Sequence, residues 1–257
     1  MLNFAANLSF LFPSHPFLDR FSASAEAGFK GCEYLFPYQF DAKEIAAQLH
    51  ACGLIQVLFN IFPGDWEAGE RGLASLPGRE AEFATSVDLA VRYAEALGCK
   101  RLHVMAGCAD ADDPRCQDAF LHNIDFAAKR CLNAGITTLI EPINPIDMPG
   151  YYLTDLDQAL EIINVIGAPN LKLQFDCYHR AMVGKDVIGG LERSIDHLGH
   201  VQIAGVPGRN EPDSGTLAYD PIFQKLIDLN YDGWVGCEYR PARKTRDGLG
   251  WIEPWIN

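Results

Sequence analysis

The sequence predicts an α/β fold, a (β/α)8 barrel, from three observations. Short apolar runs alternate with longer amphipathic stretches along the 257 residues. The hydrophobic share of 48% is large enough for a substantial core, and no linker or low-complexity tract interrupts the pattern. Eight repeats of strand and helix are typical of a closed parallel barrel covered by helices. We therefore expect residues 1–257 to form a single domain.

The candidate strands are eight short runs rich in apolar side chains. Runs of this length, bounded by turn residues, are typical of parallel strands buried on both faces. They cover residues 2–10, 31–36, 54–62, 101–107, 137–144, 171–179, 200–205 and 233–239. Because the carboxyl ends of barrel strands meet at one face, we expect side chains at these ends to lie close together.

Amphipathic stretches with helix end signals lie between most of these runs. In residues 41–53, Asp41 is a candidate N-cap, and Glu44 follows three residues later in the capping-box position. Gly28 and Gly98 follow apolar periodic segments, where glycine commonly ends a helix. The other candidate helices are residues 16–28, 78–98, 120–135, 154–167 and 220–233.

Two connections are unusually long, and the last helix is incomplete in the sequence pattern. Residues 63–78 follow the third candidate strand and residues 206–218 follow the seventh, where barrel loops carry function. After Tyr239, the remaining residues include two prolines and two glycines, so we expect a short or irregular eighth helix. Such a helix would expose apolar surface beside the first one, which favours a homo-oligomer.

Charge and cysteine usage narrow the function classes. A formal net charge of −13 opposes binding to a nucleic-acid backbone or an anionic membrane. The eight cysteines form no CxxC pair and no zinc-finger spacing, which fits a reduced cytoplasmic location. The apolar N-terminal stretch has no basic start and contains Pro13 and Pro16. We therefore expect neither a signal peptide nor a transmembrane span there.

The last four candidate strands each end in an oxygen ligand: Glu141, Asp176, Gln202 and Glu238. A single acid at a strand end often caps a helix or pairs with a surface arginine. Four such residues on consecutive strands favour convergence on one cation. An all-oxygen set suits Mg²⁺ or Mn²⁺. Because a neutral amide binds metal more weakly than imidazole does, Gln202 leaves the need for the metal open.

Glu141 and Glu238 are also the candidate catalytic residues. Two carboxylates on either side of a planar enediolate can take a proton from one carbon and return it to the next. A divalent metal bridging the neighbouring substrate oxygens would stabilise the developing charge. The sequence does not indicate which glutamate acts first as the base.

Five residues are candidate substrate contacts, each with a structural alternative. His179 follows Asp176 by three residues and either contacts substrate or serves as a core or capping histidine. Arg209 and Arg71 lie on the two long loops, where an arginine fork can bind a carboxylate but surface exposure is also common. Asn7 and His103 lie near strand ends and are either cavity-lining or structural polar groups.

The motifs together resemble a known family. The segments IEPIN, DMPGYYLT, QFDCYH, VQIAG and GWVGCEY are similar to those of hydroxypyruvate isomerases and 2-oxo-tetronate isomerases. This resemblance covers nearly the whole chain and implies a xylose isomerase-like TIM barrel. It implies metal binding at Glu141, Asp176, Gln202 and Glu238. It further implies proton transfer by the two glutamates, with His179 and Arg209 contacting substrate.

The predicted function is isomerisation of a small 2-oxo-3-hydroxy acid. The first choice of reaction is hydroxypyruvate to tartronate semialdehyde, and the alternative substrate is 2-oxo-tetronate. An isomerase or epimerase of uncharged ketoses would not need Arg209. A metal-dependent endonuclease or hydrolase on the same barrel is opposed by the net charge of −13. The paired glutamates disfavour a non-catalytic sugar-acid binding protein.

Overall fold

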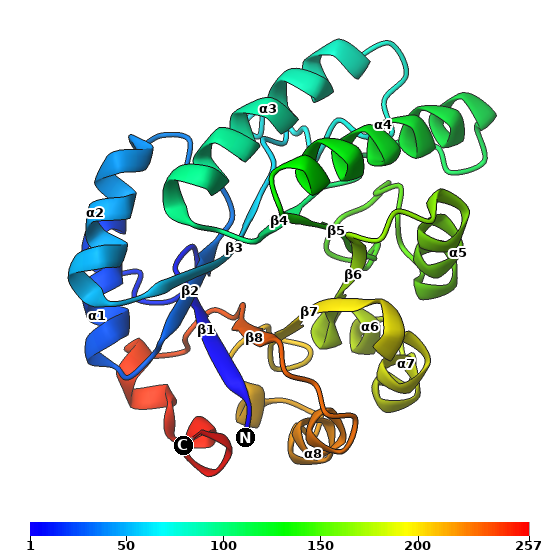
Figure 1. Cartoon of the computed structure of the whole chain (residues 1–257). Coiled ribbons are helices and arrows are strands. Elements are labelled where there is room, and N and C mark those ends of the chain that lie inside the picture. Colours follow the sequence, from blue (N-terminus) through cyan, green and yellow to red (C-terminus); the bar gives the residue numbers. More distant parts are fainter. Residues whose placement is uncertain (257) are drawn as a thin grey trace.

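The computed structural model describes residues 1–256 and contains one closed parallel barrel, with strand order β1 to β8 and β8 paired to β1 (Figure 1). The strands are β1 (Asn3–Asn7), β2 (Gly31–Tyr34), β3 (Ile55–Asn60), β4 (Arg101–His103), β5 (Thr137–Ile140), β6 (Leu171–Asp176), β7 (Leu198–Ile203) and β8 (Trp234–Cys237). Each lies inside a predicted run, except that β7 begins two residues early. The predicted (β/α)8 barrel is confirmed.

Helices surround the barrel (Figure 1). They are α1 (Arg20–Glu26), α2 (Ala42–Cys52), α3 (Glu80–Leu97), α4 (Pro114–Asn133), α5 (Leu156–Ile166), α6 (Cys177–Met182), α7 (Val187–Ser194) and α8 (Asp220–Asp228). Short 3-10 helices are η1 (Phe17–Asp19), η2 (Ile195–His197), η3 (Pro212–Ser214), η4 (Thr245–Gly248) and η5 (Gly250–Trp255). Helices α6 and α7 were not predicted from the sequence.

Local sequence signals explain the ends of α2 and α3. The Asp41 side chain accepts a hydrogen bond from the Lys43 N–H at 2.7 Å, which confirms the predicted N-cap of α2. Gly53 ends α2 with φ of 63°, and Gly98 ends α3 with φ of 66°. Both angles are left-handed, so a glycine at each position ends its helix without a Cβ clash.

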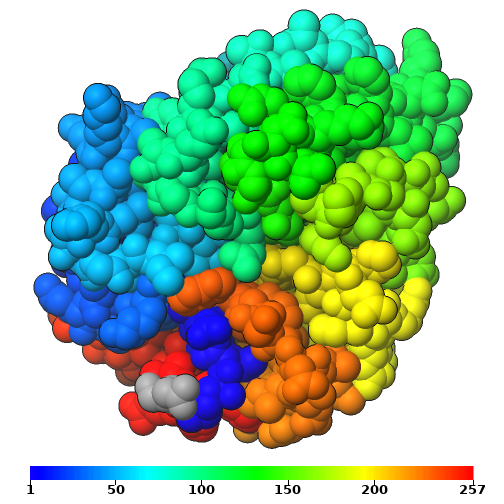
Figure 2. All heavy atoms as spheres, in the orientation of Figure 1, coloured from blue at the N-terminus to red at the C-terminus, as the bar shows by residue number. Residues whose placement is uncertain are grey.

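The chain after β8 forms only η4 and η5 within the described residues. This confirms the prediction that the helix after the eighth strand is short and irregular. Its tryptophans still pack: Trp251 contacts Phe4 and Phe223, and Trp255 contacts Phe223. Figure 2 shows the N-terminal residues lying between this C-terminal segment and the α8 region. Self-association through this side stays a prediction. Among residues 1–256, every helix is too short or too polar to cross a bilayer.

The barrel interior is apolar at one level and polar at the next. The apolar level contains Ala5, Val57, Leu58 and Leu139, with Trp234 packed against them. The polar level lies toward the carboxyl ends of the strands, where Asn7 pairs with Glu33 and Asp176 pairs with Gln202 in the strand register. Gly236 faces the Glu33 carboxylate so closely that any Cβ would collide with it. The fold thus brings polar side chains from different strands into contact.

Candidate active site

A cavity of about 510 Å³ opens at the carboxyl ends of the strands. Six predicted site residues line it: Arg71, His103, Glu141, His179, Arg209 and Glu238. Asn7, Asp176 and Gln202 are not among its lining residues and are almost fully buried. The predicted convergence of strand ends is therefore real, but the predicted residues lie in two layers.

Glu141 and Glu238 follow β5 and β8 directly and are 4% and 8% exposed. Burial raises the pKa of Glu141 well above its usual value, and repulsion from Asp176 and Glu238 raises it further. Burial also raises the pKa of Glu238, while the nearby Arg209 guanidinium opposes that rise. Buried acids with raised pKa values are the groups that proton transfer near neutral pH requires.

Arg209 lies over the cavity, on the loop after β7. Its Nη2 donates to Glu238 Oε1 at 2.5 Å, and its guanidinium lies 5.0 Å from the ring centre of Tyr178. The buried Nε has no hydrogen-bond partner in the described chain, so the guanidinium keeps a free donor. Glu211, two residues after Arg209, is not hydrogen-bonded to it and accepts from the Ala242 N–H at 3.1 Å.

Asp176 has two different oxygens. Oδ1 accepts from the Tyr178 N–H at 2.8 Å and caps α6. Helix capping was the alternative to metal binding for an acid at a strand end. Oδ2 is buried and has no hydrogen-bond partner among the described residues. Burial raises the pKa of Asp176 to about 6, against the opposing effect of Arg209. One carboxylate therefore serves the helix and leaves an oxygen free for the site.

The proton of His179 can be placed from its neighbours. Asn144 Oδ1 accepts from the Ile146 and Asp147 N–H groups, at 3.0 and 2.8 Å. The Asn144 Nδ2 must then donate to His179 Nδ1, which lies 2.6 Å away. Burial lowers the pKa of His179 well below its usual value, so the ring is neutral and carries its hydrogen on Nε2. That Nε2–H lies 3.5 Å from Asp176 Oδ2.

The residues present fit a hard divalent cation. Ligand atoms of Glu141, Asp176 and His179 all lie within 4.8 Å of one another. The unpaired Asp176 Oδ2 and the clustered, mutually repelling carboxylates favour a cation there. The His179 Nε2 carries a hydrogen and is a donor in this arrangement, so oxygen ligands fit better than this imidazole. Ligation by Gln202 and Glu238 stays a prediction.

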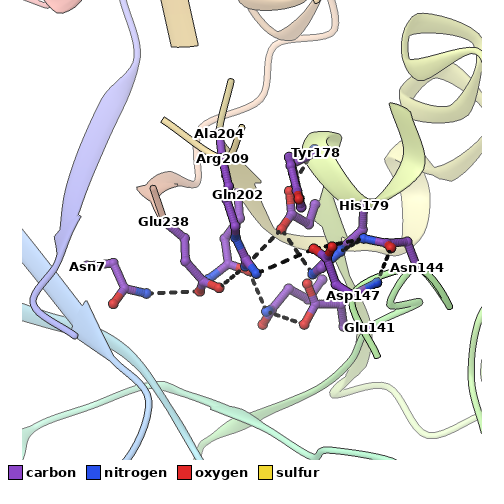
Figure 3. A network of polar contacts seen from close by, with 12 residues as sticks. Asn7, Glu141, Asn144, Asp147, Tyr178, His179, Gln202, Ala204, Arg209 and Glu238 are labelled. Atoms are coloured by element: carbon purple, nitrogen blue, oxygen red, sulfur yellow. Dashed lines mark hydrogen bonds and ion pairs between the residues drawn. The ribbon is translucent and has the colours of Figure 1, made fainter. Parts of the chain in front are cut away.

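Asn7 and Gln202 do not line the cavity, and both donate to the Glu238 carboxylate (Figure 3). Asn7 Nδ2 donates to Glu33 Oε1 at 3.1 Å and to Glu238 Oε2 at 2.9 Å. Gln202 Nε2 donates to the same two oxygens, at 2.8 and 2.7 Å. Since both amides are used within the protein, their substrate or metal contacts stay untested.

Four further polar residues of the site were not predicted from the sequence: Glu33, its partner His200, Gln174 and Asn144. Glu33 is fully buried on β2, and its Oε2 lies 2.7 Å from His200 Nε2. One signal for Glu33 was present: the tetrapeptide Gly-Cys-Glu-Tyr occurs twice, at residues 31–34 and 236–239. Gly31 and Gly236 both pair with Ala5, so the two glutamates lie at the same level on either side of β1.

His103 and Arg71 also line the cavity. His103 Nδ1 lies 3.2 Å from Asn60 Oδ1, and His103 Nε2 lies 3.6 Å from Glu141 Oε2. Burial lowers the pKa of His103 to about 3, so the ring is neutral. Arg71 donates to the Trp66 and Glu70 carbonyl oxygens, at 3.0 and 2.7 Å, and stacks on Trp66 at 3.9 Å.

Comparison with known proteins agrees with the barrel fold. A family model described as a xylose isomerase-like TIM barrel matches residues 21–255. The chain is 54% identical to a 2-oxo-tetronate isomerase of Cupriavidus necator, over 100% of this chain and 99% of that protein. It is 42% identical to a hydroxypyruvate isomerase of Escherichia coli K12, over 99% and 100% of the two chains.

Solved structures agree on the fold. A protein from Brucella melitensis described as an AP endonuclease of family 2 matches with a TM-score of 0.97 and 46% identity, over 100% of both chains. A D-psicose 3-epimerase from Clostridium cellulolyticum H10 matches with a TM-score of 0.80 over 100% of both chains, but at 16% identity this likeness shows the fold alone. From the family match and the full-length relatives, the chain belongs to the xylose isomerase-like TIM barrel family.

Proposed function

We propose that the protein is an isomerase of small 2-oxo-3-hydroxy acids that transfers a proton through an enediolate. The observation that carries the proposal is one cavity lined by two buried glutamates, Glu141 and Glu238, together with Arg209. The glutamates supply a base and an acid, and the arginine supplies a carboxylate anchor. Relatives named hydroxypyruvate isomerase and 2-oxo-tetronate isomerase support the same class.

In the proposed reaction, one glutamate removes the proton from C3 of the substrate. The electrons of the broken C3–H bond form the C2–C3 double bond, and the C2 carbonyl oxygen takes up the negative charge of the enediolate. The enediolate is protonated at C2 while the C3 oxygen becomes a carbonyl, so the hydroxyl proton formally moves from the C3 oxygen to the C2 oxygen. In this proposal the Nε2–H of His179 donates a hydrogen bond to a substrate oxygen; the support is that this side chain lines the cavity.

A divalent ion, Mg²⁺ or Mn²⁺, is part of this proposal. Glu141 and Asp176 would hold it, and Glu238 and Gln202 are the other predicted ligands. When bound, such an ion stabilises negative charge on neighbouring substrate oxygens. Arg209 binds the substrate carboxylate with donors that it does not use on Glu238.

Two substrates fit the proposal. Hydroxypyruvate is the first choice of the sequence-based prediction, in which some motifs resemble each of the two isomerases. The four-carbon 2-oxo-tetronate is favoured by one specific observation, the 54% identity to a 2-oxo-tetronate isomerase against 42% for a hydroxypyruvate isomerase. A cavity of about 510 Å³ has room for either acid, so its volume does not select the chain length.

Other activities of the same barrel fit less well. An uncharged ketose has no carboxylate to use Arg209, which is 14% exposed and lies among acidic groups. Endonuclease activity, suggested by the name of the Brucella melitensis relative, is opposed by the net charge of −13. The paired glutamates favour proton transfer over binding alone.

A substrate panel tests the proposal. Purified protein, treated with a chelator and then supplied with Mg²⁺, Mn²⁺ or neither, is offered hydroxypyruvate, 2-oxo-tetronate and free ketoses. We expect turnover of at least one 2-oxo acid. A reaction run in D2O should incorporate deuterium at C2 of the product, and added metal should restore the activity that the chelator removes. Turnover confined to ketoses would contradict the acid class. Equal rates with and without metal would contradict the metal.

A further inference from the structure

Two carboxylates and two amides form a closed hydrogen-bonded ring beneath the cavity. Its members are Asn7, Glu33, Gln202 and Glu238, from four different strand segments. Each amide N–H2 group donates one hydrogen to each carboxylate, over distances of 2.7 to 3.1 Å. All four residues are 8% exposed or less. Low exposure strengthens these bonds and makes any unpaired member costly.

The amide orientations in this ring are determined by their other contacts. Asn7 Oδ1 accepts from the Ser9 N–H at 3.1 Å, so its N–H2 group must face the carboxylates. Gln202 Oε1 accepts from Gln174 Nε2 at 2.7 Å, which fixes Gln202 in the same sense. Turning either amide over would place an oxygen against two carboxylate oxygens.

The ring continues to the other glutamate of the site. Gln174 Nε2 donates to Gln202 Oε1 at 2.7 Å and to Glu141 Oε2 at 3.0 Å. Gln174 Oε1 is buried and has no partner in the described part of the chain. A turned amide would lose both donor contacts, so the observed orientation is the better one. Glu238 and Glu141 are thus connected through two glutamines.

We infer that Glu33 is a positioning residue, which orients Glu238 through Asn7 and Gln202 and orients Glu141 through Gln202 and Gln174. Glu33 is suited to this role because its Oε1 accepts from both amides and its Oε2 contacts His200 Nε2 at 2.7 Å. It has no place on the cavity wall and therefore does not react. The inference rests on the proposed function only for its kinetic consequence.

Three variants test the ring by kinetics. Glu33→Met removes the acceptor and should lower kcat by roughly 10- to 100-fold with little change in KM, as lost supporting contacts do. Glu33→Gln keeps an acceptor oxygen for the amides if its N–H2 group faces His200, and it should retain most of kcat. Gln174→Met should lower kcat because it releases Glu141 and Gln202.

A matched control separates positioning from packing. Gln56 on β3 is also a buried glutamine, but it contacts the Leu58 carbonyl oxygen and Cys32 rather than either glutamate. Gln56→Met should therefore leave kcat unchanged, even if it lowers Tm. Equal kcat losses in Gln56→Met and Gln174→Met would overturn the inference, as would full kcat in folded Glu33→Met.

Crystal structures of the wild type, Glu33→Met and Gln174→Met test the ring without any substrate. We expect the Glu238 carboxylate to change rotamer in the first variant and the Glu141 carboxylate in the second. Unmoved carboxylates in both variants would overturn the inference. A wild type that turns over no 2-oxo acid would contradict the proposed function but not the positioning role of Glu33, because these side-chain positions do not depend on the substrate.

Discussion

The floor and the rim of the cavity are built differently. The floor is the polar layer at and directly beneath the base of the cavity: Glu141, Gln174 and Glu238 line it, and Asn7, Glu33 and Gln202 lie behind them. The rim is residues 63–78 and 206–218. Floor side chains bond to one another across strands, as Gln202 does with Glu33 and Glu238. On the rim, Arg71 bonds to backbone oxygens of its own loop. Reacting groups are thus held by the sheet, whereas recognition groups depend on loops.

The largest effect is expected from the two floor glutamates that line the cavity. Glu141→Gln and Glu238→Gln each remove a proton-transfer group while keeping its shape, so kcat should fall roughly 10²- to 10⁴-fold. Steady-state kinetics and thermal melting measure the two consequences separately. The exposed Glu44→Gln is the control and should behave as wild type. Near-normal turnover in either floor variant would remove that glutamate from the mechanism.

Arg209 lies on the rim and contacts the floor through Glu238, so replacing it should cause the next largest fall in activity. Arg209→Met removes the carboxylate anchor and should lower kcat/KM for 2-oxo acids by about 10- to 100-fold, the range of a charged hydrogen bond. Any activity on an uncharged ketose should survive. Arg115→Met, at a side chain 81% exposed, is the matched control. If Arg209→Met loses activity on acids and on ketoses by the same factor, Arg209 does not act as a carboxylate anchor.

A smaller effect is expected where Asn144 sets the protonated nitrogen of His179. Asn144→Asp keeps the acceptor for the Ile146 and Asp147 N–H groups but replaces the donor to His179 Nδ1. The ring hydrogen should move to Nδ1, and kcat should fall about 10-fold. Nitrogen-15 chemical shifts of the imidazole report which nitrogen carries hydrogen. An Nε2–H form that persists in Asn144→Asp would refute this account.

The smallest effect is expected on the rim at Arg71. Arg71→Met should raise KM for a 2-oxo acid by about two- to fivefold, the size expected for a partly exposed charge, and should leave kcat unchanged. Measuring KM for three-carbon and four-carbon acids shows whether Arg71 reads substrate length. A large fall in kcat would mean that Arg71 on the rim contributes to the chemical step as well as to substrate binding.

The sequence predicted the barrel because each strand and helix has a local apolar period. The ring could not be predicted from local periodicity, because it depends on which residues become neighbours across strands. Glu238 was predicted from its strand end, whereas Glu33 in the same tetrapeptide was not, because it lay among the apolar residues of an early strand. The register that places both beside Asn7 is a property of the closed barrel.

The site residues show the same limit at the level of single atoms. Asp176 was predicted as a ligand, and capping was its alternative; the structure gives Oδ1 to the cap and leaves Oδ2 unpaired. His179 was predicted near the site, but its protonated nitrogen follows from the Asn144 turn, which no spacing rule describes. Residue type and strand position were predictable, and hydrogen-bond direction was not.

The contact between Gly236 and the Glu33 carboxylate has a consequence for redesign of this barrel. The space that an alanine methyl at residue 236 would need is already filled by an acidic side chain from β2. In Gly236→Ala the Glu33 carboxylate must therefore shift to make room for the new methyl group, which would disturb the ring from β8. Libraries that vary β8 should for this reason vary Glu33 on β2 at the same time.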